Sequence, residues 1–469
     1  MNMQIIVAFG SYFTVLGTIG FFAYRQSQKK GDYILGARSL NYWITALAAH
    51  ASDMSGWLFM GFPATIFLQG LPAAWTAVGL VFFMYFNWKY VAPRLRILTE
   101  QYQSATISSF FAQRFDDSNT TLLRTVGACA CLMFFTLYIS ANFVALGYLF
   151  ESIFDISYTT GIYFGALVIS YILLGGYLSI AWVDFFQGIF LLCMILLVPT
   201  VAFFHTDGLH AIITTANLKN ISLNFLPHSL SDIWSALLLA IGWGLGYFGQ
   251  PHIVTKFMGI NDVKDMVKAQ RVGLTWQTIT LFAAICVGLI GIAFFPQGLA
   301  NNELIFVAMT KILFSPFFAG IILCAILASA INVIGAQVLS SASILAEDFF
   351  KHWITTNSKT KTNTLVQIAS RLSVVAICIV AMFFAVTNRQ KTIYDLVLYA
   401  WTGLGCSFGP LMLVALHSTL RNTWAAITGI IIGALTAVLW PLYNSAIPAM
   451  LPGFAFSLAG IWLVSRSSK

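Results

Sequence analysis

Hydrophobic residues occur along this chain in long runs that are separated by short polar segments. A helix that crosses a bilayer needs about 20 mostly apolar residues, because every backbone amide must be hydrogen-bonded within its own helix. Thirteen stretches meet this requirement, with approximate cores at 5–24, 42–67, 71–91, 123–150, 158–182, 185–204, 232–250, 273–296, 317–346, 367–386, 392–417, 423–440 and 449–465. The pattern therefore predicts an all-α polytopic membrane protein with about 13 transmembrane helices.

The composition agrees with a chain that uses lipid as its solvent. Its 469 residues are 59% hydrophobic and 9% charged, whereas about a quarter of the residues of a soluble globular protein are charged. This excludes a soluble enzyme and a disordered protein. The seven cysteines lie in apolar runs without a CxxC spacing, so neither a disulfide framework nor a zinc site is predicted.

The basic residues predict an orientation in the membrane. With thirteen spans, twenty of the 24 Lys and Arg residues fall on one side, and the other side holds only Lys219, Lys311, Arg389 and Lys391. Because basic loops face the cytoplasm, we expect the N-terminus outside and the C-terminus in the cytoplasm. The same loops explain the net charge of +8, so no nucleic-acid partner is predicted.

Asp53 is the only acidic residue deep within an apolar span. A charge there costs about 2.5–3.5 kcal/mol on insertion scales, so it indicates either a structural pair or a site for an ion or substrate. Small and polar residues surround it from Ala48 to Gly56, and Gly61 and Pro63 follow. This segment predicts unwound backbone near the middle of the membrane, which is tolerated only around a cavity.

A second interruption lies near the end of the seventh span, between Gly242 and His252. Gly242 and Gly246 form a GxxxG, which alone indicates close helix packing. Trp243 and Tyr247 are four residues apart and would project from one helix face. This aromatic pair indicates either core packing or a wall for a small apolar ring.

The two interrupted spans occupy corresponding positions of two five-helix repeats, spans 2–6 and 7–11. Because each repeat has an odd number of helices, the second repeat must enter the membrane from the face opposite to the first. The inverted repeats of secondary transporters have this arrangement. We expect a site between spans two and seven, with half-helix N-termini facing an anionic group and unwound carbonyls facing a cation. Residues 1–469 form one predicted domain, divided into 1–41 (first helix and cytoplasmic loop), 42–204 (repeat one), 232–417 (repeat two) and 423–469 (two C-terminal helices).

Two further polar features have alternative interpretations. The ninth span carries Ser329 and Asn332 in a run that continues to Ser343, which indicates either a close-packed face or oxygen ligands for a hard cation. Asp184 lies between the fifth and sixth spans and predicts either a helix N-cap or a place on an ion's exit path.

At these positions the chain resembles the sodium:solute symporter family, from about residue 36 to residue 456. The stretches that carry the resemblance are 36–40, 51–58, 182–184, 242–252, 347–348 and 452–456. The resemblance implies a transporter without catalytic residues. It also implies that the substrate is L-proline and that Na⁺ is the coupling ion.

The resemblance assigns roles to individual residues. It implies that Asp53 and Ser55 take part in sodium and substrate binding, and that the carbonyls of Ala51 and Met54 face the sodium ion. The substrate-side residues that it implies are Tyr138, Trp243, Tyr247 and Pro251. It further implies that Arg38 and Asp184 support sodium-coupled turnover.

The sequence departs from the family pattern at two places. An ungapped alignment puts the hydroxyl pair that completes the sodium site in the ninth span on Asn332 and Val333. The Asn332 amide oxygen can coordinate a cation, whereas Val333 has no oxygen. His50 stands where family members carry a small residue, and it predicts either a buried neutral side chain or, because histidine titrates near neutrality, a proton carrier.

Together these features predict a symporter of the bacterial inner membrane that imports L-proline with a cation, Na⁺ being expected and H⁺ the alternative. A symporter for another small zwitterion or carboxylate fits the same pattern. A transporter-like sensor module would need a signalling domain, and the chain ends at Lys469 after a short tail. An enzyme is not predicted, because the histidines are scattered and form no HExxH. The expected partners are the substrate and membrane lipids, and no oligomeric state is predicted.

Overall fold

The computed structural model describes residues 3–28, 38–117, 121–169, 177–350, 359–444 and 446–467. The secondary structure of these residues is helical, and their one recorded extended pairing is an isolated bridge between Leu40 and Ile260. The all-α prediction is therefore confirmed for the described part of the chain.

The first half of the chain contains three long helices, α1, α8 and α10, and several short ones. Its elements are α1 (Met3–Gln28), α2 (Tyr42–Ala51), α3 (Gly56–Phe59), α4 (Gly61–Gln69), η2 (Leu71–Ala74), α5 (Trp75–Phe86), η3 (Asn87–Val91), α6 (Ala92–Gln101), α7 (Ile107–Arg114), α8 (Leu122–Phe154), α9 (Tyr158–Ile169), α10 (Tyr177–His205) and α11 (Gly208–Leu218). The η3 segment is a π-helical turn that joins α5 and α6 without a break.

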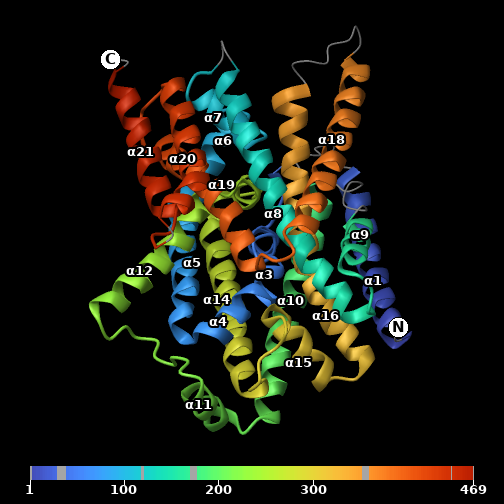
Figure 1. Ribbon diagram of the computed structural model, residues 1–469. Coiled ribbons are helices and arrows are strands. Elements are labelled where there is room, and N and C mark those ends of the chain that lie inside the picture. Colours follow the sequence, from blue (N-terminus) through green and yellow to red (C-terminus); the bar gives the residue numbers. More distant parts are fainter. Residues whose placement is uncertain are drawn as a thin grey trace.

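The second half has the same character. Its elements are α12 (Leu230–Gly244), η5 (Leu245–Gly249), α13 (Pro251–Met258), η6 (Val263–Asp265), α14 (Met266–Phe294), η7 (Asn302–Leu304), α15 (Ile305–Leu313), α16 (Pro316–Ile344), η8 (Leu345–Phe350), α18 (Lys359–Thr387), α19 (Ile393–His417), α20 (Thr423–Tyr443) and α21 (Met450–Ser467). Figure 1 shows these helices as one bundle, with the start of α1 and the end of α21 at opposite ends.

Ten helical stretches of the described residues are long and apolar enough to cross a membrane. The predicted second span is absent from this group because it is divided into α2, α3 and α4, none longer than ten residues. Residues 170–176 of the predicted fifth span lie outside the described residues, and α21 is a shorter apolar helix. The molecule is thus a multi-pass membrane protein, and the described residues do not confirm the count of thirteen spans.

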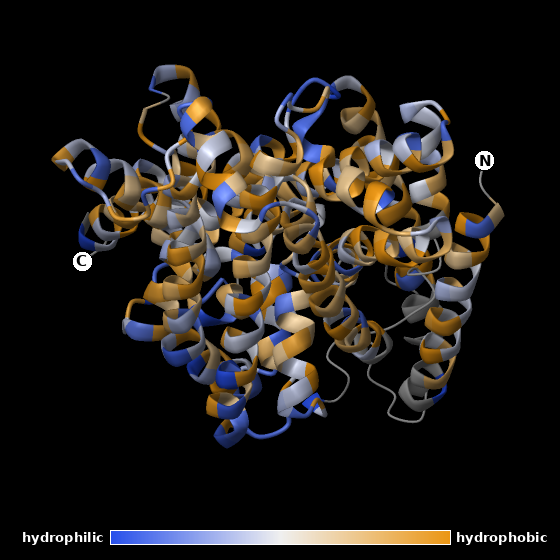
Figure 2. Cartoon of the chain, turned by 90° about the horizontal axis from the view of Figure 1, so that it is seen from below, coloured by the Kyte–Doolittle hydropathy of each residue, from blue (hydrophilic) through white to orange (hydrophobic). Residues whose placement is uncertain are grey.

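Apolar side chains cover the outside of the bundle as well as its interior. Phe204, Leu230 and Phe383 are among the large hydrophobic residues that are exposed in the isolated chain. Figure 2 shows hydrophobic residues along the helices and hydrophilic residues gathered near helix ends and loops. This distribution fits a protein that is surrounded by lipid.

The sequence interpretation of Asp184 as an N-cap is wrong. Asp184 lies inside α10, which begins at Tyr177, and its side chain is buried. The boundary was misplaced because Asp184 is polar, and polarity alone does not distinguish a turn from a buried ion pair. The short helices α6, α7, α11 and α15 were also not predicted, since they lie in segments interpreted as loops.

Candidate functional site

The first break lies between α2 and α3. The N–H groups of Asp53 and Met54 both donate to the His50 carbonyl at 3.2 Å, and the Ser55 N–H turns back to the Asp53 carbonyl at 3.1 Å. Ser55 then begins α3, because its Oγ accepts the Trp57 N–H at 3.2 Å. Among the described residues, no donor to the carbonyls of Ala51 and Met54 is recorded, so both oxygens are available to a ligand.

The second break lies between α12 and α13. The helix tightens into the 3₁₀ turn η5, becomes extended at Gln250, and restarts at Pro251. Proline has no N–H to donate, so it suits the first position of the new helix. Gly246 permits close packing here, since a Cβ at this position would overlap the indole of Trp401. Both breaks predicted from the sequence are present.

A hydrogen bond joins the two breaks. The Tyr247 hydroxyl, on η5, donates to Oδ2 of Asp53, and the same hydroxyl accepts the amide N–H of Gln277 at 2.8 Å. Asp53 is 6% exposed and Tyr247 is fully buried. The only acid of the second predicted span therefore faces the interrupted seventh span inside the core, as the sequence predicted.

The π turn η3 holds both breaks from a third helix. The Asn87 amide donates to the Tyr247 carbonyl at 3.2 Å, and the next residue, Trp88, donates its indole N–H to Nε2 of His50 at 3.1 Å. His50 is fully buried and also packs against the Trp276 ring. Because its Nε2 accepts this hydrogen bond and so carries no hydrogen of its own, the arrangement favours the buried neutral side chain over the proton carrier.

Aromatic rings enclose the site beside Asp53. Trp243 lies 5.1 Å from Trp57 between ring centroids, and its indole N–H donates to the Tyr394 hydroxyl at 2.8 Å. Trp401 donates its indole N–H to the Trp243 carbonyl at 2.8 Å and meets the Tyr247 ring edge-on at 5.0 Å. Trp243 and Tyr247 thus belong to one aromatic wall, and these contacts are compatible with both interpretations of the pair, core packing and a wall for a small apolar ring.

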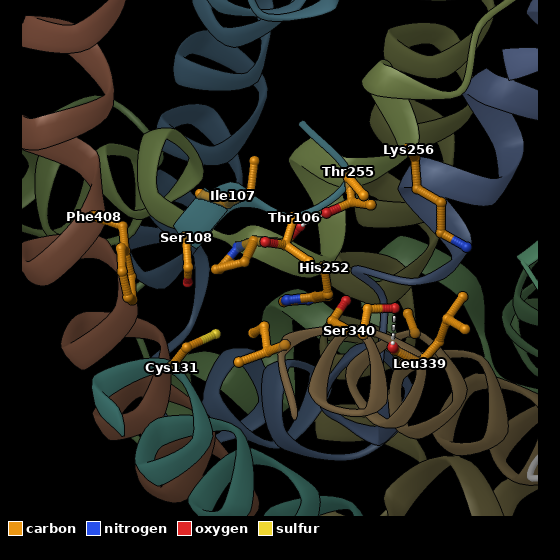
Figure 3. Close-up of a pocket in the computed structure, with 15 residues that line it drawn as sticks. Thr106, Ile107, Ser108, Cys131, His252, Thr255, Lys256, Leu339, Ser340 and Phe408 are labelled. Atoms are coloured by element: carbon orange, nitrogen blue, oxygen red, sulfur yellow. Dashed lines mark hydrogen bonds between the residues drawn. The ribbon is translucent and has the colours of Figure 1, made fainter. Parts of the chain in front are cut away.

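The remaining substrate-side candidates lie close to this wall. Tyr138 of α8 is buried, interacts with the Ser55 side chain, and meets the ring of His252 edge-on at 5.8 Å. Pro251 and His252 line a small cavity that the start of α7, together with α8, α13, α16 and α19, encloses. Figure 3 shows His252 among these side chains, together with Ser108 and Ser340. The cavity measures about 20 Å³, which is room for about one water molecule.

The ninth predicted span, α16, carries buried side-chain oxygens without a recorded partner among the described residues, on Asn332, Gln337 and Ser341. Ser329 donates its hydroxyl to the Ile326 carbonyl at 2.7 Å, and Val333 is buried without a polar atom. Asn332 is 1% exposed, and neither polar atom of its amide has a partner in the described part of the chain. Since buried polar groups are normally hydrogen-bonded, the Asn332 amide indicates a ligand or water at this point of α16.

The two coupling candidates of opposite charge occupy separate places. Asp184 forms a buried ion pair with Lys256 of α13, with 2.8 Å between Oδ2 and Nζ. Arg38 donates to the carbonyls of Met258 at 2.9 Å and Thr99 at 3.0 Å, and so ties the end of α13 to α6. The neighbouring Leu40 exchanges backbone hydrogen bonds with Gly259 and Asn261. Both residues therefore hold the second half of the interrupted seventh span.

A buried carboxylate outside the membrane spans supports the aromatic wall. Glu303, on η7, accepts the N–H groups of Ile393 at 2.7 Å and Tyr394 at 3.4 Å, at the start of α19. Burial raises the pKa of Glu303 from 4.5 to about 7, and the two amide hydrogen bonds oppose this effect. The carboxyl group is therefore neutral below about pH 7 and carries its charge above it.

Sequence reasoning missed several members of the site. Lys256 was counted as a loop charge, although it stands one turn beyond His252 and so shares a helix face with a residue near the break. Trp401 and Tyr394 lie in an apolar span whose pattern contains no interruption. Gln277 had a usable signal, because a long amide in the middle of a predicted membrane helix needs a partner.

Comparison with known proteins identifies the family. Residues 33–433 match the sodium:solute symporter family. The chain is 40% identical over 454 residues to the high-affinity proline transporter PutP of Bacillus subtilis (strain 168), a match that covers 95% of this chain and 94% of that protein. It is also 40% identical over 485 residues to the sodium/proline symporter of Staphylococcus aureus (strain JH9), covering 100% of this chain and 93% of the relative.

Solved structures confirm the architecture. A Na⁺-coupled sialic acid symporter in a substrate-bound outward-open state superposes with a TM-score of 0.82 at 16% identity, covering 99% of this chain and 98% of that one. The nucleobase-cation-symport-1 family transporter MHP1 has a TM-score of 0.53 at 14% identity, with 93% and 95% coverage. At these identities the likeness concerns the fold alone. The family match and the full-length relatives together establish that the chain belongs to the sodium:solute symporter family.

Proposed function

We propose that this protein imports L-proline together with a cation, Na⁺ being the first choice, by alternating access across the bacterial inner membrane. The observation that carries the proposal is the hydrogen bond between Tyr247 and Asp53, which joins two interrupted helices within the buried core. The names of the 40% identical relatives supply proline and sodium as the substrates to test.

The chemistry of the site suits a small zwitterion with an apolar ring. Asp53 balances the ammonium group or the cation, and the rings of Trp57 and Trp243 provide an apolar wall. The available carbonyls of Ala51 and Met54 suit a hard cation. A ligand bound at Asp53 lies beside the Tyr247 hydroxyl, so binding acts on the link between the breaks and permits a change of access.

The inward movement of one positive charge supplies enough free energy to accumulate the substrate inside the cell. It is worth about 2.3 kcal/mol per 100 mV, which corresponds to roughly fifty-fold accumulation of a neutral solute. ATP is therefore not required. We also infer that the two breaks belong to inverted five-helix repeats, with the N-terminus outside and the C-terminus in the cytoplasm, as the distribution of basic residues supports.

H⁺ is a second candidate for the coupling ion, and Val333 favours it. Its side chain gives no oxygen at the place where the resemblance expects a hydroxyl, so the sodium site has fewer ligands and proton coupling becomes the alternative. Labelled-proline uptake into proteoliposomes, with Na⁺ and H⁺ gradients imposed separately, decides between them. Uptake driven only by the H⁺ gradient would exclude Na⁺, and uptake driven by neither would contradict the symporter. Competition by betaine, pantothenate and acetate tests the other small zwitterions and carboxylates.

Val333→Thr is expected to raise the apparent affinity for sodium, because the hydroxyl adds a ligand without a large change in volume. A gain of about three- to tenfold corresponds to one modest polar interaction. The measurement is the Na⁺ concentration that gives half-maximal proline uptake. Val338→Thr, on the same buried helix, is the matched control. An unchanged sodium dependence in Val333→Thr would remove this position from the ligand set.

Glu303 is expected to make proline affinity depend on pH. Above about pH 7 its charge favours the N-terminus of α19 and so holds Tyr394 against Trp243, whereas below pH 7 the neutral group binds the amides more weakly. The KM for proline should therefore be a few-fold higher at pH 6 than at pH 8. In Glu303→Gln the KM should stay near the pH 6 value throughout. A variant that kept the wild-type pH profile would assign the titration to another group.

A further inference from the structure

Gln277 has an unused hydrogen-bonding atom beside the proposed site. It lies in α14 and is 0% exposed, and its amide nitrogen donates to the Tyr247 hydroxyl at 2.8 Å. That hydroxyl gives its only proton to Asp53, so it can accept from Gln277 but cannot donate to it. This determines the orientation of the amide. Its NH₂ group faces Tyr247, and its oxygen Oε1 is not bonded to that hydroxyl.

The amide oxygen Oε1 of Gln277 has no donor in the described part of the chain. Buried polar atoms are normally hydrogen-bonded, and the membrane core offers no bulk water as a substitute. Gln277 and Asp53 both bond the hydroxyl of Tyr247, so the two side chains meet at that group. A ligand that carries two N–H donors can satisfy both residues.

We propose that Gln277 contacts the substrate directly, accepting one N–H of its ammonium group while Asp53 accepts the other. This inference rests on the proposed function and deepens it by naming the substrate class. A secondary ammonium, as in an imino acid, has two N–H groups and matches the two acceptors. A tertiary ammonium has one and a quaternary ammonium none, so each methyl group added to the nitrogen removes one of the two bonds.

The test compares ligands that differ only in their N–H groups. L-proline, N-methyl-L-proline and proline betaine compete against labelled proline in proteoliposomes that contain the full chain. Gln277→Met replaces the amide by an apolar group of similar length. Gln270→Met is the matched control, because Gln270 lies on the same helix and its amide donates to the Tyr85 carbonyl at 3.2 Å, away from Asp53.

In the wild type, N-methyl-L-proline should inhibit about tenfold more weakly than proline, the effect expected for one hydrogen bond to a charged group. Gln277→Met should raise the KM for proline by a similar factor and leave inhibition by N-methyl-L-proline nearly unchanged, so the preference is lost. Gln270→Met should keep the preference. The same loss of preference should appear when Gln277→Met is introduced into Tyr247→Phe, because the contact does not pass through that hydroxyl.

Three results would overturn the inference. Equal weakening of both ligands by Gln277→Met would mean that Gln277 only supports Tyr247. A changed sodium dependence with an unchanged preference would make Oε1 a cation ligand. An unchanged KM would remove Gln277 from the site. If Gln277→Met fails to insert into the membrane, Gln277→Leu provides the same comparison. A wild type that does not transport proline would instead contradict the proposed function.

Discussion

Asp53→Asn is expected to abolish cation-driven proline uptake while the protein still inserts and folds. The amide has nearly the same size and can still accept the Tyr247 hydroxyl, so the link between the breaks is kept. The negative charge that balances a cation or an ammonium is lost, and hydrogen bonds to charged groups contribute about 1.5–3 kcal/mol each. We expect the initial rate to fall by at least about a hundredfold, because the Asn side chain leaves a bound charge unpaired in a dry site.

The matched control for this prediction is Asp155→Asn. Asp155 is exposed and has a left-handed backbone (φ 53°), which asparagine also tolerates. Its initial rate of labelled-proline uptake in proteoliposomes should equal that of the wild type. Undiminished uptake by Asp53→Asn, at equal protein content, would exclude Asp53 from the site.

Removal of one member of the Asp184–Lys256 pair is expected to cause the largest loss of stability. The two side chains are 1% and 2% exposed, so Lys256→Met leaves the buried carboxylate of Asp184 without its ion-pair partner. Breaking such a pair typically costs about 3–5 kcal/mol, whereas replacing both charges by apolar groups is often close to neutral. Lys256→Met alone should therefore lower the thermal midpoint in detergent, and Asp184→Leu with Lys256→Met should restore most of it.

Uptake measurements on the same variants separate stability from coupling. If the pair only stabilises the fold, the double variant should also recover the transport rate. If the double variant is stable but slow, the charges take part in turnover, as the resemblance implies for Asp184. A Lys256→Met protein with wild-type stability would contradict the buried pair.

The sequence predicted the parts of the site that disturb an apolar pattern. Asp53 and the glycine-rich segment before Pro251 are visible because a charge and repeated glycines are unusual in membrane helices, and the structure joins them. Trp401 could not be found in this way, since an aromatic residue in an apolar helix fits the pattern whether or not it lines a site. Lys256 was misassigned because its partner, Asp184, is distant in sequence.

The number of continuous spans was harder to predict than their existence. A hydropathy pattern does not distinguish one helix from α2, α3 and α4 in succession, because all the residues between Ala48 and Phe67 are compatible with burial. What divides them is the hydrogen bonding of a few amides near Asp53. Where a helix is interrupted depends on its contacts with neighbouring helices. A single sequence does not show which helices will be neighbours.

The π turn in the third predicted span has a consequence for how this protein tolerates change. Its extra residue allows adjacent side chains, Asn87 and Trp88, to reach η5 and α2 respectively. Deleting this extra residue would convert the π turn into a regular α-helical turn and change which side chains face η5 and α2. We therefore expect functional variants of this protein to tolerate single substitutions in this turn more readily than insertions or deletions.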